Sequence, residues 1–298
     1  MTKTLLIHHA ANRGTDNISN SLRSLRICLE TDARVVEVDI TPLSGGDFAL
    51  LHDSVLDIAT NSTGSVFNTT AEQIRRIQYM DHGIVTDETV GLLSQAVSLI
   101  QSYSFFQELQ LDLKSHTPLS QDVLNDLLCI IEPVKDRIRI TSNADWALRR
   151  LNVMDNSLLL GFDPQLYLDV DPIEENGEIT PPFRIGAYGY RDDHPLSSHR
   201  WSPPSDYLEA RAEALIAQSP LDVIWYIDMH LLAQSHEDGF EWITYLQERG
   251  YQVDAWTLDP DQQEQITLAR RLVDAGIDRI TTNDAPRLAK ALGDSVEF

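Results

Sequence analysis

Eight short runs rich in β-branched and large apolar residues alternate with segments of helical period along the whole chain. Most runs are bounded by Gly, Asp, Asn or Ser, which is typical of strands. They span Leu5–His8, Val35–Ile40, Leu109–Lys114, Arg137–Thr141, Leu158–Phe162, Val223–Asp228, Gln252–Leu258 and Arg279–Thr282. Eight strand–helix repeats in about 300 residues predict a (β/α)8 TIM barrel. A doubly wound sheet also alternates in this way, but no Gly-x-Gly-x-x-Gly follows the first run, which favours the barrel.

The helical segments carry apolar residues three and four positions apart, as amphipathic helices do. In the first of them Leu22, Leu25 and Leu29 share one face, and we expect this helix to begin at a cap formed by Asp16 or Asn17.

The chain of 298 residues could hold two domains, but an α/β barrel of this length folds as one, so we expect a single domain over residues 1–298. The connection 41–89 is longer than a plain barrel needs and predicts a small insertion within that domain. We expect it to form a hairpin, with Gly45-Gly46 as the turn and Phe48–Leu51 as the return strand. A short helix near Thr70–Ile77 should follow, where Thr69 and Glu72 have the spacing of a capping box.

A second long connection, residues 163–205 after the fifth predicted strand, is rich in Pro, Asp, Tyr and Arg and has no clear period. Long loops of a barrel lie over the C-terminal ends of the strands, where active sites are found. We expect this loop to contribute to substrate specificity; a loop that merely covers the barrel is the alternative.

Acidic residues outnumber basic ones by 46 to 23, and the net charge is −23. Nucleic acids and anionic membrane surfaces are bound through clustered Lys and Arg, so neither is an expected partner. No segment approaches the ~20 apolar residues of a membrane span, and the N-terminus lacks the apolar stretch of a secretory signal. Cys28 and Cys129 are too few for a disulfide framework. We therefore expect a cytoplasmic protein; its oligomeric state cannot be read from the sequence.

Candidate catalytic side chains begin on the second predicted strand, where Glu37 and Asp39 are two residues apart and therefore share a face. In a half-exposed antiparallel sheet, this would be ordinary polar-out alternation. In a closed barrel, helices cover the outer face, so both carboxylates must point into the barrel. Two desolvated carboxylates repel each other unless they are protonated or share a cation.

The third predicted strand repeats the arrangement with Asp112 and Lys114. A lysine that extends from the strand end into solvent is the alternative explanation for Lys114. Together with Glu37 and Asp39, Asp112 gives three hard oxygen ligands on adjacent strands. Such a set predicts one divalent ion, Mg²⁺ or Ca²⁺, rather than zinc.

Two histidines fall near these carboxylates in the predicted barrel. His8 ends the first strand, and His52 follows the hairpin after the second. A single histidine is usually structural or exposed, but two at strand ends beside a carboxylate cluster favour a general acid and base.

In their order, these motifs resemble the glycerophosphodiester phosphodiesterase family, whose fold is a (β/α)8 barrel. That family has His-Arg-Gly after the first strand, Pro-Glu-Asn-Thr at a helix start, Glu-x-Asp on strand two, a His-Asp pair and then Glu-x-Lys. Trp-Thr and Thr-Asp occur near its last two strands. The corresponding residues here are His8-His9-Ala10, Ile18-Ser19-Asn20-Ser21, Glu37-Val38-Asp39, His52-Asp53, Asp112-Leu113-Lys114, Trp256-Thr257 and Thr282-Asn283. The resemblance is dense over residues 4–114 and 252–290.

The resemblance implies a metal-dependent phosphodiesterase that hydrolyses glycerophosphodiester-like small molecules to an alcohol and glycerol 3-phosphate. It implies that His8 and His52 act as acid and base, that Lys114 stabilises the transition state, and that the three carboxylates hold the metal. His9, Asn20 and Trp256 are the implied substrate-binding residues.

Several motifs depart from the family. In the Glu-x-Lys motif, Asp112 stands in place of the glutamate. His9 occupies the position of the family arginine if His8 is the first histidine, and Ser19 replaces a glutamate. The adjacency of His8 and His9 leaves open which of them is the catalytic one. The losses also motivate two other hypotheses: a phosphodiester-binding barrel of the same family with impaired turnover, and an unrelated barrel chemistry such as a metal-dependent lyase or aldolase.

Overall fold

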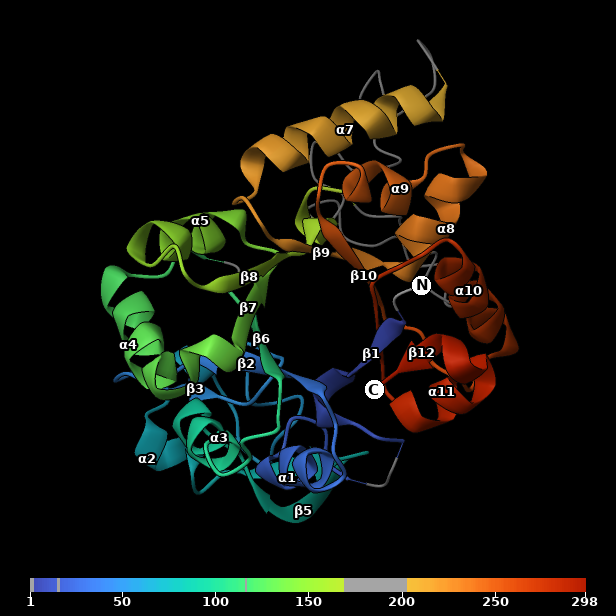
Figure 1. Cartoon of the computed structure of the whole chain (residues 1–298). Coiled ribbons are helices and arrows are strands. Elements are labelled where there is room, and N and C mark those ends of the chain that lie inside the picture. Colours follow the sequence, from blue (N-terminus) through green and yellow to red (C-terminus); the bar gives the residue numbers. More distant parts are fainter. Residues whose placement is uncertain (1–2, 15–16, 116, 169–202) are drawn as a thin grey trace.

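The computed structural model describes residues 3–14, 17–115, 117–168 and 203–298. Its main sheet closes into a barrel of eight parallel strands, seen approximately end-on in Figure 1, in the order β1-β2-β6-β7-β8-β9-β10-β11. The strands of the barrel are β1 (Thr4–His8), β2 (Val35–Pro42), β6 (Glu108–Leu113), β7 (Ile138–Ser142), β8 (Leu159–Phe162), β9 (Ile224–Asp228), β10 (Gln252–Trp256) and β11 (Arg279–Thr282). The prediction of a (β/α)8 barrel is confirmed, and each predicted strand lies within two residues of its expected bounds.

The barrel closes at β1, which pairs with β11 on one side and with β2, through His8 and Val36, on the other. A short strand near the C-terminus, β12 (Val296–Glu297), also pairs with the start of β1, where Thr4 lies opposite Val296. This strand was not predicted from the sequence.

Helices surround the barrel (Figure 1). They are α1 (Leu22–Glu30), α3 (Leu93–Ile100), α4 (Gln121–Ile131), α5 (Asp145–Met154), α7 (Pro204–Gln218), α8 (Met229–Glu237), α9 (Trp242–Gln247), α10 (Gln263–Asp274) and α11 (Ala285–Leu292). The expected cap of α1 at Asp16 or Asn17 is wrong. The helix begins four residues later, because the Ser21 hydroxyl accepts a hydrogen bond from the backbone N–H of Ser24 and satisfies one of the free donors of the first turn.

The segment 41–89 contains the predicted hairpin, formed by β2 and β3 (Phe48–Ala49). It continues with α2 (Ala71–Ile74) and a second hairpin, β4 (Gln78–Asp81) and β5 (Ile84–Thr89), which was not predicted. The capping box is one residue later than expected: Thr70 and Gln73 exchange the two hydrogen bonds. A small apolar cluster, separate from that of the barrel, includes residues of this segment.

The two faces of each barrel strand differ sharply in chemistry. On β2, Val36, Val38 and Ile40 face the helices and are fully buried, whereas Glu37 and Asp39 alternate with them and point inward. Strands β6, β7 and β11 repeat this alternation, with Gln110, Thr141 and Thr281 facing the cavity, so much of the barrel interior is polar. Its C-terminal end is therefore a polar mouth.

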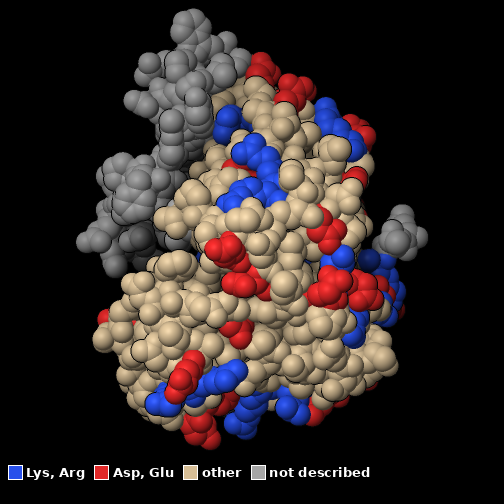
Figure 2. Space-filling view, turned by 90° about the vertical axis from the view of Figure 1, so that its left-hand side faces the viewer, with Lys and Arg blue, Asp and Glu red and all other residues tan. Residues whose placement is uncertain are grey.

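Most of the predicted long loop, residues 169–202, lies outside the described residues. This part holds the loop residues that we expect to contribute to substrate specificity, namely Arg184, Arg191, His194, His199, Arg200 and Trp201. On the face that carries α4 and α5, acidic and basic side chains are interspersed among uncharged ones (Figure 2). Among the described residues, none of the helices has the length and apolar character needed to cross a membrane.

Candidate active site

A cavity of about 340 Å³ opens at the C-terminal ends of the strands. Its lining includes side chains from the mouth and from deeper in the barrel. These residues are His9, Glu37, His52, Gln110, Asp112, Leu113, Lys114, Thr141, Asn143, Asp163, Gln165, Tyr226, Trp256, Thr257 and Thr281. Six of the predicted site residues line this cavity: His9, Glu37, His52, Asp112, Lys114 and Trp256. Asp39 is not a lining residue, but its Oδ1 lies 3.0 Å from Lys114 Nζ.

The structure brings together the three predicted carboxylates. Glu37 and Asp39 come from β2 and Asp112 from β6, where Asp39 and Asp112 are paired in register. One oxygen of each lies within 4.8 Å of the others. Oxygen ligands at this spacing can hold a hard divalent ion.

The surroundings of Glu37 fit such an ion. Its Oε2 accepts a hydrogen bond from the backbone N–H of Ala10 at 2.6 Å, but the buried Oε1 has no hydrogen-bond partner within the part of the chain that the structure describes. Burial raises the pKa of Glu37 well above its usual range, and the charges of Asp39 and Asp112 raise it further. A bound cation would both satisfy the unpaired oxygen and relieve this repulsion.

Lys114 lies beside the same carboxylates. Its Nζ is 2.6 Å from Asp112 Oδ2 and 3.0 Å from Asp39 Oδ1. Burial alone would lower the pKa of the Lys114 ammonium, but the two carboxylates more than offset this effect and raise it. Conversely, Lys114 keeps the pKa of Asp39 below its ordinary value despite the burial of that carboxyl. Lys114 is thus a permanently charged part of the site.

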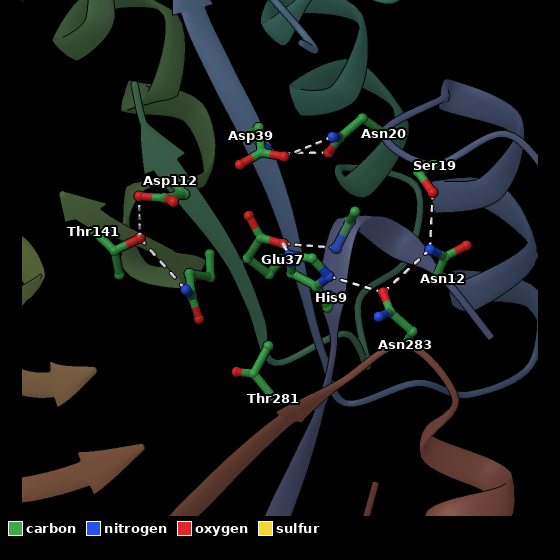
Figure 3. A network of polar contacts seen from close by, with 12 residues as sticks. His9, Asn12, Ser19, Asn20, Glu37, Asp39, Asp112, Thr141, Thr281 and Asn283 are labelled. Atoms are coloured by element: carbon green, nitrogen blue, oxygen red, sulfur yellow. Dashed lines mark hydrogen bonds and ion pairs between the residues drawn. The ribbon is translucent and has the colours of Figure 1, made fainter. Parts of the chain in front are cut away.

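The first histidine of the site is His9, and the expectation that His8 faces the cavity is corrected. His9 Nε2 lies 3.9 Å from Glu37 Oε2, and its Nδ1 is 2.8 Å from the side-chain oxygen of Asn283 (Figure 3). His8 is fully buried outside the cavity, where its ring packs edge-on against Phe298.

His8 is also unsuited to proton exchange with a substrate. Its Nδ1 hydrogen-bonds the carbonyl of Asn12 at 3.0 Å, and burial lowers the pKa of His8 to about 4. With His9 as the match to the family histidine, the position of the family arginine is occupied by Ala10. Ala10 and Ala11 adopt positive φ angles of 48° and 55°, a conformation that glycine usually provides.

His52 lies at the rim of the cavity. Its side chain is 62% exposed, and Nδ1 is 3.2 Å from Asp53 Oδ1. The His-Asp pair predicted from the sequence is therefore present in space as well.

Asn20 does not line the cavity, in contrast to its expected role in substrate binding. Its amide donates to Asp39 Oδ2 at 2.7 Å, and its side-chain oxygen accepts the backbone N–H of Asp39 at 2.9 Å. The hydroxyl of Tyr79 in turn donates to the carbonyl of Asn20. Asn20 therefore orients a carboxylate instead of contacting the cavity (Figure 3).

The sequence analysis missed several polar residues of the far wall, among them Asn143, Asp163 and Gln165 at the ends of β7 and β8. Burial raises the pKa of Asp163 well above its usual range. The signal that could have found them is the alternation already used for Glu37 and Asp39, continued to the end of every strand.

Comparisons with known proteins agree with this geometry. The model of the glycerophosphoryl diester phosphodiesterase family matches residues 9–286. The chain is 23% identical to glycerophosphodiester phosphodiesterase 1 of Bos taurus over 260 residues, which cover 84% of this chain and 71% of the relative. It is 26% identical to the glycerophosphodiester phosphodiesterase of Caldanaerobacter subterraneus over 167 residues, 53% of this chain and 66% of that one.

Solved structures share the fold. A phosphodiesterase of Oleispira antarctica, determined in complex with the product sn-glycerol-3-phosphate, superposes with a TM-score of 0.67 at 18% identity over 97% of each chain. A putative glycerophosphoryl diester phosphodiesterase from Silicibacter pomeroyi gives the same TM-score and identity over 98% of this chain and 94% of that one. The barrel, its carboxylate cluster and the family match over nearly the whole length lead to one conclusion: the chain belongs to the glycerophosphoryl diester phosphodiesterase family of phosphoric diester hydrolases.

Proposed function

We propose that this protein is a metal-dependent phosphodiesterase that hydrolyses glycerophosphodiesters to an alcohol and glycerol 3-phosphate. The observation that carries the proposal is the cluster of Glu37, Asp39 and Asp112, which lies beside Lys114 at a cavity that His9 also lines. The product bound to the Oleispira antarctica phosphodiesterase supports the choice of glycerol 3-phosphate.

Glu37, Asp39 and Asp112 would hold one Mg²⁺ or Ca²⁺, because their oxygen atoms are the ligands that these ions prefer. When bound, the ion supplies positive charge that polarises the phosphodiester and offsets its negative oxygens. Asn20 contributes by fixing the direction of the Asp39 carboxylate.

His9 and His52 would act as general base and general acid. Each lines the cavity, and the two come from different connections of the barrel, so they can approach the phosphorus from different sides. His9 would take the proton of the attacking hydroxyl, which we place on the glycerol moiety, and His52 would protonate the leaving alcohol oxygen. This step would release the alcohol and leave a cyclic glycerol phosphate. Water would then open the ring with the two proton transfers reversed, and glycerol 3-phosphate would be the product. Such assistance contributes roughly 10²–10⁴-fold per group.

Lys114 would stabilise the negative charge that develops on the phosphoryl oxygens. Its ammonium is mostly buried beside Asp39 and Asp112, and a fixed positive charge in a partly dry site acts more strongly than the same charge in water. Trp256, which lines the cavity at the end of β10, would contact the substrate through its ring.

The test measures glycerol 3-phosphate released from a glycerophosphodiester, with added Mg²⁺ or Ca²⁺ and after chelation. We expect turnover that chelation abolishes, and a decrease in kcat of about 10²–10⁴-fold in both His9→Ala and His52→Ala. His8→Asn is the matched control and should keep near wild-type kcat, since His8 lies outside the cavity. Ligand protection without product would instead identify a binding barrel, and an inactive His8 variant beside an active His9 variant would refute our assignment.

A further inference from the structure

A chain of hydrogen bonds leads from His9 away from the cavity to a carboxylate in the loop after β10. His9 Nδ1 is 2.8 Å from Asn283 Oδ1, and Asn283 Nδ2 is 2.8 Å from Asp259 Oδ2. The other oxygen of Asp259 accepts the backbone N–H of Asn283 at 2.9 Å. Asn283 is thus bound to Asp259 through both its backbone and its side chain.

The carboxylate determines which way the amide of Asn283 points. An ionised carboxylate only accepts hydrogen bonds, so the NH₂ group of Asn283 must face Asp259 and its oxygen must face His9. Asn12 supports this orientation, because its NH₂ group lies 3.4 Å from the same Asn283 oxygen (Figure 3). An amide oxygen cannot donate, so the hydrogen between it and the histidine belongs to His9 Nδ1.

The hydrogen on Nδ1 determines the state of the other ring nitrogen of His9, Nε2. A neutral histidine carries one N–H, so a hydrogen on Nδ1 leaves Nε2 as an acceptor. Nε2 is the nitrogen near Glu37, at the cavity. We propose that Asp259 and Asn283 are positioning residues that fix the tautomer of His9, so that Nε2 is free to take a proton from the substrate.

The assignment of Nε2 as the base rests on the proposed phosphodiesterase function, whereas the tautomer itself does not. Asp259 also makes hydrogen bonds that can stabilise the fold. Its backbone N–H donates to Gln265, and its carboxylate accepts from Thr282. A loss of activity alone would therefore not separate positioning from folding. The test must read the tautomer directly.

The substitution Asp259→Asn is expected to reverse the donors and acceptors in the hydrogen bonds that join residue 259, Asn283 and His9. The new amide oxygen can still accept the backbone N–H of Asn283, which leaves the new NH₂ group facing the Asn283 side chain. Asn283 would then rotate its oxygen toward residue 259 and present its own NH₂ group to His9 Nδ1. The hydrogen of the neutral imidazole would move to Nε2, and the acceptor at the cavity would be lost.

The two-bond ¹H–¹⁵N spectrum of labelled protein distinguishes a protonated from an unprotonated ring nitrogen, and the His9 signals are those missing from His9→Gln. At a pH where His9 is neutral, we expect protonated Nδ1 in the wild type and protonated Nε2 in Asp259→Asn. We expect kcat to fall by about 10²–10⁴-fold, the contribution of one general base, with KM changed less than about threefold.

The double substitution Asp259→Asn with Asn283→Asp tests the proposal by rescue. The amide at 259 would now donate to a carboxylate at 283, which would again accept the hydrogen of His9 Nδ1. We expect both the wild-type tautomer and most of the lost kcat to return. Asp284→Asn is the matched control: it replaces a neighbouring carboxylate that caps α11, and it should leave the His9 signals unchanged.

An unchanged tautomer in Asp259→Asn would overturn the proposal, and so would a double variant that folds but keeps the inverted tautomer. If Asp259→Asn does not fold, Asn283→Ala serves instead: it removes the acceptor, so a mixture of tautomers supports the proposal and a purely wild-type signal refutes it. A wild-type protein that shows the expected tautomer but cleaves no diester would contradict the proposed function and leave the positioning of His9 intact.

Discussion

The N-terminal end of the barrel is closed by a buried ionic cluster whose disruption should be costly. Glu108 on β6 accepts two hydrogen bonds from the guanidinium of Arg139, at 3.0 and 2.9 Å, and one from Arg279 at 2.6 Å. Glu108 and Arg139 are each only 7% exposed. The substitution Glu108→Gln keeps the shape of the side chain but removes the only carboxylate that pairs with Arg139 in the described residues.

The expected loss follows from this geometry. Breaking a buried ion pair by removing one partner typically costs about 3–5 kcal/mol, because the remaining charge is left desolvated. Glutamine keeps one oxygen, which at the Oε1 position can still accept from Arg139 Nε and from Arg279, so two of the three hydrogen bonds can remain. Asp254, which lies near Arg279, can also ionise and offset part of that charge. We therefore expect a loss at the lower end, about 3 kcal/mol in the free energy of unfolding at pH 7.

The measurement is urea unfolding followed by tryptophan fluorescence, with the midpoint compared at constant slope. Asp155→Asn is the control, because Asp155 accepts a hydrogen bond from Lys135 at 2.7 Å but the pair lies at the surface. Since solvent screens such pairs, its loss should be much smaller. Equal losses in the two variants would refute the argument that burial makes the Glu108 pair costly.

The sign of the pH dependence provides a second check. Burial would raise the pKa of Glu108, but Arg139 and Arg279 lower it below its ordinary value of 4.5. A carboxylate with a lowered pKa in the folded state stabilises the fold above its unfolded pKa, and this contribution is lost as the pH falls through the lowered value. The difference between wild type and Glu108→Gln should therefore shrink in acid.

Two further predictions concern the middle of the barrel. Burial raises the pKa of Asp254 from 3.8 to about 8. Between these pH values the unfolded chain binds fewer protons than the folded one, so stability falls as the pH rises. Asp254→Asn, which can still accept a hydrogen bond from Thr281, should flatten this fall in denaturation curves between pH 5 and 9. In Gly161→Ala the new methyl carbon would lie 2.4 Å from Tyr226 Cε2 and 2.6 Å from Thr141 Cγ2. We expect this overpacking to cost about 1–3 kcal/mol in the free energy of unfolding, and the displaced Tyr226 ring, which lines the cavity, to raise KM. Unchanged stability and KM would show that the ring has room to move.

The fold could be predicted because the signals that specify it are local and repeated. Each barrel strand carries an outward apolar face such as Val36, Val38 and Ile40, and turn residues mark its ends. The helix starts were less predictable, because several residues compete as caps. Ser21 caps α1 although Asn17 precedes it, and Thr70 rather than Thr69 caps α2. Which hydroxyl caps a helix depends on tertiary contacts that fix the entry of the chain.

The carboxylate cluster was predictable for a different reason. A charged pair two residues apart on a strand that is covered outside can only face inward, so Glu37 and Asp39 specified their own direction. The first strand carries no such signal, because Leu6 and Ile7 are both apolar and both fully buried. Its inward and outward faces look alike in the sequence, and His8 could therefore be mistaken for the histidine of the site.

The buried carboxylates at the two ends of the barrel differ in how far protein side chains neutralise them. This difference supports the C-terminal end as the site of the proposed cation. At the N-terminal end, Glu108 meets two arginines, and its pKa is lowered by them. At the C-terminal end, Lys114 serves Asp39 and Asp112, while Glu37 keeps an unpaired buried oxygen and a raised pKa. Leaving a buried carboxylate oxygen without a partner costs stability, and the cation that we propose for this site would recover that cost on binding. Glu37→Gln should accordingly raise the melting temperature of the metal-free protein and abolish the further increase that Mg²⁺ or Ca²⁺ gives to the wild type. A variant that is less stable than the metal-free wild type, or that still responds fully to the ion, would show that Glu37 is satisfied without a metal.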